Sequence, residues 1–168
     1  MADGVIAPDE FVALVDRRAA RAERTLVGVT GPPGSGKSSL ADLLRRRLDA
    51  VVVPMDGFHL SNAVLDARRL RERKGAPETF DAPAFAELVV TLRAGDRDVD
   101  APDFDRRADE PTAAAIRVPA TAGLVVVEGN YLLLDHGAWA PLGELWDLVA
   151  YVDLDPSVRR SRLVDRHV

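Results

Sequence analysis

The sequence predicts an α/β fold, in which a parallel, doubly wound sheet carries helices on both faces. Three observations predict it. Short apolar runs rich in valine recur at residues 25–30, 51–53, 124–129 and 148–153, which is typical of strands buried in a parallel sheet. Segments with helical spacing of apolar residues lie between these runs. A glycine-rich loop, residues 31–38, joins the first run to the helix that follows it.

This loop fits the pattern G-x-x-x-x-G-K-[ST] without a mismatch. Its glycines let backbone N–H groups converge on a phosphate, and the N-terminus of the following helix adds about half a positive charge. The alternative is a Gly/Pro-rich turn that happens to carry a lysine, and the complete strand–loop–helix context argues against it. We therefore expect a nucleoside triphosphate to contact Gly31, Gly34, Ser35, Gly36, Lys37, Ser38 and Ser39.

Two side chains of the loop and one distant carboxylate predict the cofactors. Lys37 is expected to reach the β- and γ-phosphates, and the Ser38 hydroxyl to hold Mg²⁺. Glu128 ends the third apolar run, where many phosphate-loop enzymes place an acid for Mg²⁺ or its water. ATP and Mg²⁺ are therefore the expected cofactors.

Asp56 leaves the second apolar run, and ligands of open α/β sheets bind at the carboxyl ends of the strands. A carboxylate at that position would face the terminal phosphate of the nucleotide. The competing interpretation is a turn aspartate, because Asp-Gly is a common turn pair. The position after the second strand favours a functional role. His59, three residues on, is equally compatible with substrate contact and with capping a turn.

The rest of the chain supplies further elements. Apolar spacing and start signals predict helices over residues 8–22, 61–74, 84–94 and 156–168. Residues 98–106 contain two weak strand positions, with residues 115–119 as the expected hairpin partner. The helix over 61–74 ends in five cations, which indicate either a solvated face or a site that recruits an anionic substrate: Arg68, Arg69, Arg71, Arg73 and Lys74.

Composition limits the classes of protein. The 168 residues suit a single domain, 1–168, with 47% apolar and 29% charged residues. The absence of cysteine excludes disulfides and thiolate sites, and it fits a cytoplasmic protein. No apolar run approaches the length of a membrane span or signal peptide. A net charge of −5 argues against general nucleic-acid affinity. We therefore expect no nucleic-acid or membrane partner, and a homodimer is compatible with the sequence.

Four segments together resemble one family. They are the loop at 31–38, the Met-Asp-Gly-Phe segment at 55–58, the Arg-Lys-Gly-Ala-Pro-Glu-Thr-Phe-Asp segment at 73–81 and the Val-Glu-Gly-Asn segment at 127–130. In this order they resemble the pantothenate kinase, uridine kinase and phosphoribulokinase branch of the P-loop kinases, and most of all bacterial nucleoside/nucleotide kinase family proteins. The resemblance covers nearly the whole chain and implies a P-loop NTPase fold.

The resemblance implies roles for individual residues. Asp56 matches the aspartate that takes the proton of the acceptor hydroxyl, and Glu128 matches the glutamate near the metal. Arg162 and Arg166 fall in the helix that leads into the lid, where arginines approach the transferred phosphoryl group. The implied catalytic set is Asp56, Lys37, Arg162 and Arg166, and the implied acceptor contacts are Asp56, His59, Lys74, Phe80 and Arg106.

Two departures from the family pattern matter. Arg106 stands where a histidine is usual in pantothenate kinases, which argues against pantothenate itself as the acceptor. Family members also continue with the rest of the lid, a final strand and a helix beside the adenine, whereas this chain stops at Val168. We therefore expect a kinase domain that lacks its C-terminal lid and last strand.

The predicted activity is ATP-dependent transfer of the γ-phosphoryl group to a hydroxyl of a small-molecule acceptor. Pantothenate-like alcohols, nucleosides, sugars and sugar phosphates all remain open as acceptors. A nucleotide-dependent switch or binding module is the main alternative, but the Asn-Lys-x-Asp segment common in guanine readers is absent. A nucleic-acid-dependent ATPase is disfavoured by the acidic balance and by the lack of a basic, aromatic-interleaved groove.

Overall fold

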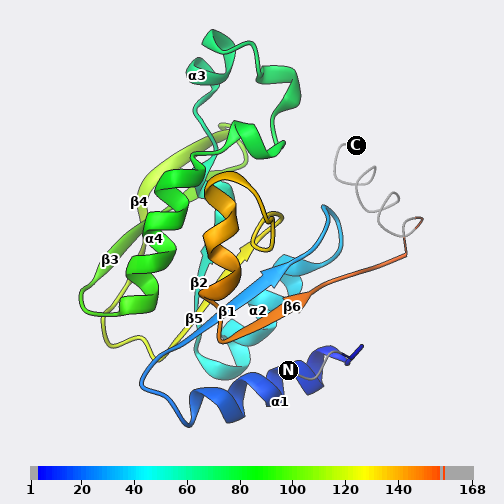
Figure 1. Cartoon of the computed structure of the whole chain (residues 1–168), viewed down its shortest axis with the longest axis vertical. Helices are drawn as coiled ribbons and strands as arrows, with labels where there is room; N and C mark the ends of the chain where they lie inside the picture. Colours follow the sequence, from blue (N-terminus) through cyan, green and yellow to red (C-terminus); the bar gives the residue numbers. More distant parts are fainter. Residues whose placement is uncertain (1–3, 156, 158–168) are drawn as a thin grey trace.

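The computed structural model describes residues 4–155 and 157, and a parallel sheet runs through this part of the chain (Figure 1). Its strands, in spatial order, are β2 (Val51–Pro54), β5 (Leu124–Gly129), β1 (Thr25–Thr30) and β6 (Leu148–Tyr151). Every neighbouring pair is parallel, so the carboxyl ends of all these strands lie at one edge of the sheet.

Helices cover both faces of the sheet. One face packs against α1 (Pro8–Ala19) and α2 (Lys37–Leu48), and the other packs against α4 (Ala82–Ala94) and the 3₁₀ segment η4 (Gly137–Glu144). Side chains alternate along β5, so Val126 faces the α1 and α2 side while Val125 and Val127 face α4. The predicted doubly wound α/β fold is confirmed.

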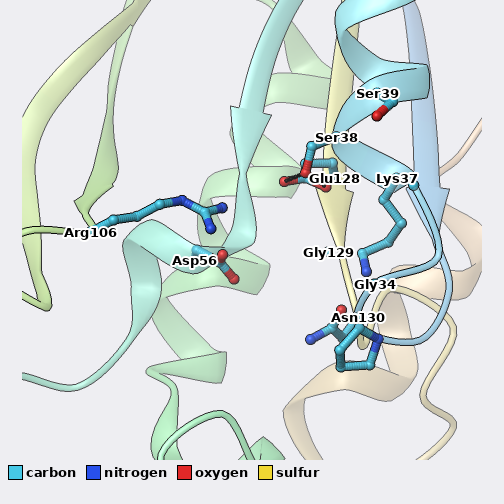
Figure 2. Close-up of a pocket in the computed structure, with 11 residues that line it drawn as sticks. Gly34, Lys37, Ser38, Ser39, Asp56, Arg106, Glu128, Gly129 and Asn130 are labelled. Atoms are coloured by element: carbon cyan, nitrogen blue, oxygen red, sulfur yellow. Dashed lines mark hydrogen bonds between the residues drawn. The ribbon is translucent and has the colours of Figure 1, made fainter. Parts of the chain in front are cut away.

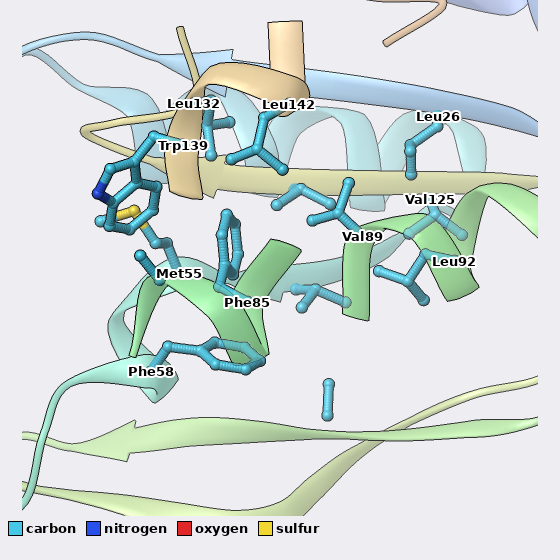
Figure 3. Close-up of a cluster of buried hydrophobic side chains, with 14 of the residues drawn as sticks. Leu26, Met55, Phe58, Phe85, Val89, Leu92, Val125, Leu132, Trp139 and Leu142 are labelled. Carbon is cyan, nitrogen blue, oxygen red and sulfur yellow. The ribbon is translucent and has the colours of Figure 1, made fainter. Parts of the chain in front are cut away.

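The core on the α4 side is the larger of two apolar clusters, and Figure 3 shows its centre. Phe85, Val89 and Leu92 of α4 meet Leu26 and Val125 of the sheet, and all of these side chains are fully buried. Fully burying such a side chain contributes roughly 1.5–3 kcal/mol. This cluster holds α4, and the segments packed on it, against the sheet.

A two-stranded antiparallel hairpin stands beside the sheet, formed by β3 (Val99–Asp105) and β4 (Glu110–Val118) (Figure 1). The expected hairpin is therefore confirmed, and it is longer than the sequence indicates. Buried Ala101 and Val118 join it to the α4-side core. Its register shifts between Ala101 and Asp103, around Pro102, which cannot donate a ladder hydrogen bond. The tip of the hairpin reaches the carboxyl edge of the main sheet.

The prediction of a single helix over residues 61–74 is wrong. The chain instead forms α3 (Asn62–Ala67), a turn, and the short 3₁₀ segment η2 (Arg71–Arg73). The break falls at Arg69, whose φ of 57° is left-handed, so the helix cannot continue through it. After the break, the Leu70 amide donates to the Leu65 carbonyl at 2.8 Å and closes the turn.

Other expected boundaries moved by a few residues. The first helix ends at Ala19 rather than at residue 22, and the strand expected over residues 148–153 ends at Tyr151. Further 3₁₀ turns are η1 (Met55–Phe58) and η3 (Pro77–Thr79). Among the described helices, none combines the length and the apolar character that crossing a membrane would require. The helix expected over residues 156–168 lies almost entirely outside the described residues.

Candidate active site

A pocket of about 400 Å³ opens at the carboxyl edge of the sheet (Figure 2). Four segments form it: the loop after β1 with the start of α2, the η1 turn after β2, the end of β5, and the tip of the β3–β4 hairpin. Because β5 lies between β2 and β1, Glu128 sits between Asp56 and the phosphate loop. The lining residues are Pro33, Gly34, Gly36, Lys37, Ser38, Ser39, Asp56, Arg106, Glu128, Gly129 and Asn130.

The phosphate loop begins at a position that only glycine fits. Gly31 has φ of +143°, and a Cβ added there would lie 2.2 Å from the carbonyl oxygen of Val152. The loop ends at Gly36, with φ of 102°, and α2 starts directly after it at Lys37. The N–H groups at the start of α2 and its positive helix end therefore face the pocket, as binding of a phosphate requires.

Lys37 is held within the loop. Its side chain is almost buried, and its Nζ donates a hydrogen bond to the carbonyl oxygen of Pro32 at 3.1 Å. Figure 2 shows the side chain running back along the loop toward Gly34. The ammonium charge is thereby kept close to the backbone that would cradle the phosphates.

Ser38 and Glu128 form a pair across the pocket. The Ser38 hydroxyl lies 3.2 Å from Oε1 and 3.3 Å from Oε2 of the Glu128 carboxylate. Both groups offer hard oxygen atoms, and Mg²⁺ in nucleotide sites usually takes one or two protein oxygens besides phosphates and waters. No set of three or more His, Cys, Asp or Glu side chains converges on a metal site within the described residues. This donor set therefore fits Mg²⁺ that arrives with a nucleotide.

Electrostatics at Glu128 also suit a cation. Burial raises the pKa of the Glu128 carboxyl, and the negative charge of Asp56 raises it further. Lys37, the Ser38 hydroxyl and Arg106 oppose this rise but do not cancel it. Two carboxylates facing one pocket repel each other, and a bound divalent cation would relieve that repulsion.

Asp56 enters the pocket from η1, directly after β2. Its backbone carbonyl accepts a hydrogen bond from the His59 amide at 3.1 Å, and the His59 Nδ1 lies 2.8 Å from the same oxygen. These contacts fix the turn that carries the carboxylate. Within the described residues the carboxylate itself forms no hydrogen bond or ion pair, so it can meet an incoming hydroxyl.

Three of the predicted acceptor contacts lie outside the pocket lining. The His59 ring packs between Phe80 and Phe104, with ring centroids 4.0 Å and 4.9 Å apart. Burial lowers the pKa of His59, although the Asp56 carbonyl and carboxylate raise it, so the imidazole is favoured in its neutral form. Phe80 is itself buried. Contact of these side chains with an acceptor stays a prediction.

The basic segment after α3 is largely paired with acids. Arg71 lies near Asp66 and Asp109, at 3.7 Å and 3.6 Å, and Arg73 lies 2.6 Å from Glu78. Lys74 donates to the Asn62 amide oxygen at 2.8 Å and to the Asp109 carbonyl at 2.6 Å. These contacts favour the solvated and structural interpretation of the segment over direct recruitment of an anion.

The sequence analysis missed three residues of the lining: Pro33, Gly129 and Asn130. The backbone carbonyl of Asn130 accepts a hydrogen bond from the Thr30 hydroxyl at 3.3 Å, which joins the ends of β5 and β1. Its place directly after a predicted strand, at the edge where ligands bind, was a signal that could have found it. Arg162 and Arg166 lie outside the described residues.

A phosphate loop at the end of a central parallel strand, with a carboxylate at the end of each of the next two strands in the sheet, defines a P-loop nucleotide-binding protein. The family described as an AAA domain matches residues 27–167 of this chain. A candidate uridine kinase of Schizosaccharomyces pombe is 37% identical over 158 residues, which make up 87% of this chain and 67% of that protein. A pantothenate kinase of Leifsonia xyli is 34% identical over 143 residues, which make up 80% of this chain and 44% of that protein.

A solved structure supports the same assignment. The crystal structure of a candidate fructose transport system kinase from Silicibacter sp. TM1040 superimposes with a TM-score of 0.89 at 38% identity, covering 97% of this chain and 82% of that one. The chain belongs to the family described as an AAA domain, and its named relatives place it among the small-molecule P-loop kinases. It spans 67% of the length of the S. pombe protein and 44% of the length of the L. xyli pantothenate kinase.

Proposed function

We propose that the protein is an ATP-dependent kinase that transfers the γ-phosphoryl group to a hydroxyl of a small-molecule acceptor. One observation carries the proposal: a single pocket collects the phosphate loop, the Ser38–Glu128 pair and the Asp56 carboxylate. A protein that only bound a nucleotide would need the first two. The carboxylate on the far side of Glu128 is the additional group that phosphoryl transfer to an alcohol requires.

The loop side of the pocket binds and neutralises the nucleotide. Backbone N–H groups at the start of α2 and the ammonium of Lys37 stabilise negative charge on the β- and γ-phosphates. Ser38 and Glu128 would hold Mg²⁺, and the ion would supply further neutralisation of the phosphate charge. Phosphoryl transfer requires little covalent chemistry from the protein, so positioning and charge stabilisation account for most of the catalysis.

The Asp56 side of the pocket activates the acceptor. An alcohol becomes a better nucleophile when its proton can pass to a carboxylate about 3 Å away. The strand order supports this role for Asp56, since β5 alone separates its strand from the strand that carries the phosphate loop. By family resemblance we also assign Arg162 and Arg166 to the lid that would enclose the transferred group and limit ATP hydrolysis.

The relatives of this chain are named for several different acceptors. Relatives and fold neighbours are named for uridine, pantothenate, fructose and D-glycerate, and each of these molecules carries hydroxyl groups. An ADP-release assay across such alcohols tests the proposal directly. We expect ATP turnover to rise at least tenfold above its acceptor-free rate with one class of alcohol. A slow turnover that no alcohol changes would contradict the kinase proposal and favour a nucleotide-dependent switch.

A further inference from the structure

Arg106 is a cation that enters the pocket from the side opposite to the phosphate loop. It lies at the tip of the β3–β4 hairpin, and its guanidinium points toward Asp56 and Glu128 while Lys37 lies beyond them (Figure 2). The phosphate loop and Lys37 therefore supply the donors for the nucleotide, and Arg106 lies on the acceptor side of Asp56.

Among the described residues this guanidinium has no ion-pair partner, which sets it apart from the cations of the 71–74 segment. Arg71, Arg73 and Lys74 all lie within ion-pair distance of carboxylates. Arg106 acts on Glu128 only as a minor electrostatic influence on its pKa. A guanidinium stays charged at all physiological pH values and offers donors that match a carboxylate or phosphate in a bidentate arrangement.

The hairpin tip that carries Arg106 is anchored. The Asp105 carboxylate accepts hydrogen bonds from the amides of Arg107 and Ala108, at 2.7 Å and 3.1 Å, and closes the turn. The Asp109 carbonyl accepts from the Lys74 ammonium at 2.6 Å and from the Asn62 side-chain amide at 2.9 Å. Because the turn is held from both ends, the main-chain position of Arg106 is set before any ligand binds.

The hairpin is also packed against the turn that carries the proposed base. A Cβ added at Gly57 would lie 2.5 Å from the carbonyl oxygen of Pro102, so the backbones of η1 and β3 touch at this point. Gly57 directly follows Asp56, and Pro102 lies four residues before Arg106 in the same hairpin. The carboxylate of Asp56 and the guanidinium of Arg106 are therefore carried by two segments in direct backbone contact.

From this arrangement we infer that the acceptor carries an anionic group, a carboxylate or a phosphate, which Arg106 binds while Asp56 faces the hydroxyl. This inference rests on the proposed function and names the acceptor class: a small hydroxylated anion rather than a neutral sugar or nucleoside. Its hydroxyl and its anionic group must both fit, beside the γ-phosphate, in one pocket of about 400 Å³.

The test uses acceptor series that differ in charge alone. One series is glycerol, D-glycerate and glycerol phosphate, and the other is ribose, ribonate and ribose phosphate. In the full-length protein with a non-hydrolysable ATP analogue, calorimetry should show at least one anion binding about 10- to 100-fold more tightly than its neutral parent, the usual value of a hydrogen bond to a charged group. The carboxylate and phosphate members distinguish the two sources of charge. Equal binding of charged and neutral members throughout both series would overturn the inference.

Variants assign the effect to one side chain. Arg106→Gln should raise KM for the preferred anion about 10- to 100-fold and leave the KM for ATP and the melting temperature unchanged. For Arg106→Lys we expect a KM between those of the unchanged protein and Arg106→Gln, because a lysine keeps the positive charge but lacks the paired N–H donors of a guanidinium. Arg107→Gln is the matched control, since Arg107 is the adjacent exposed arginine and does not line the pocket. It should leave every constant unchanged.

Two results would count against Arg106 as the anion contact. One is that Arg106→Gln lowers kcat equally for charged and neutral acceptors at constant KM, which would place the guanidinium on the transferred phosphoryl group. The other is that Arg107→Gln has the same effect as Arg106→Gln. Efficient phosphorylation of neutral alcohols without preference for anions would defeat this inference and leave the proposed kinase function standing. Absence of phosphoryl transfer to any alcohol would defeat the proposed function.

Discussion

Replacing Gly31 with alanine tests the geometry of the phosphate loop. The new Cβ would lie 2.2 Å from the Val152 carbonyl oxygen, where ordinary contact is about 3.5 Å, so backbone must move by about 1 Å. The φ of +143° adds strain of about 1–3 kcal/mol, and the steric conflict adds about 1–3 kcal/mol more. We expect Gly31→Ala to lower the free energy of unfolding by about 2–6 kcal/mol, measured by urea titration, and to weaken ATP binding by calorimetry.

Gly137→Ala is the matched control for this experiment. Gly137 also has a left-handed φ, of +60°, but a Cβ there would meet no atom within 4 Å. Only the backbone cost of about 1–2 kcal/mol applies, and ATP affinity should not change because Gly137 lies outside the pocket lining. If the two variants lose equal stability and both keep ATP affinity, the loop does not have the close approach to Val152 on which this reasoning depends.

Two further predictions concern the nucleotide side of the pocket. Lys37→Ala should weaken Mg·ATP binding or turnover by at least tenfold while the fold remains, measured by calorimetry and circular dichroism; unchanged affinity and turnover would remove the loop lysine from the mechanism. Burial and the negative charge of Asp56 raise the pKa of Glu128 in the folded, ligand-free protein. Ionisation of Glu128 therefore lowers the free energy of unfolding as pH rises above the ordinary pKa of a glutamate. Glu128→Gln should therefore stabilise the ligand-free protein at about pH 8, lose this advantage at about pH 4, and weaken Mg·ATP binding; destabilisation at about pH 8 in urea titrations would contradict the argument.

Much of the site could be predicted because strand ends and loop motifs are local features of the sequence. Asp56 and Glu128 each follow a valine-rich run, and the parallel order of the strands brings both acids to the phosphate loop. Arg106 was found through family resemblance rather than through pattern. Its position in the pocket depends on the hairpin tip, which is held by Lys74 and Asn62 from a segment more than 30 residues earlier.

The elements that could not be predicted depend on contacts distant in sequence. The break in the expected helix over residues 61–74 occurs at Arg69, an unremarkable helix residue by propensity, and no glycine or proline marks it. His59 could not be placed by pattern either, because its ring packs on Phe80 and on Phe104 of the hairpin. Local propensity contains no information about such partners.

The most direct test of the account is the rate of phosphoryl transfer in Asp56→Asn, measured by rapid quench with saturating ATP and the preferred acceptor. Asparagine keeps the size and part of the hydrogen bonding of the aspartate but cannot take the hydroxyl proton. The account predicts that kcat falls by roughly 10²- to 10⁴-fold, the usual contribution of a general base, while ATP affinity changes little. A variant that keeps full kcat but loses ATP binding would show that Asp56 is a metal ligand, and it would contradict the proposed acceptor-activating role.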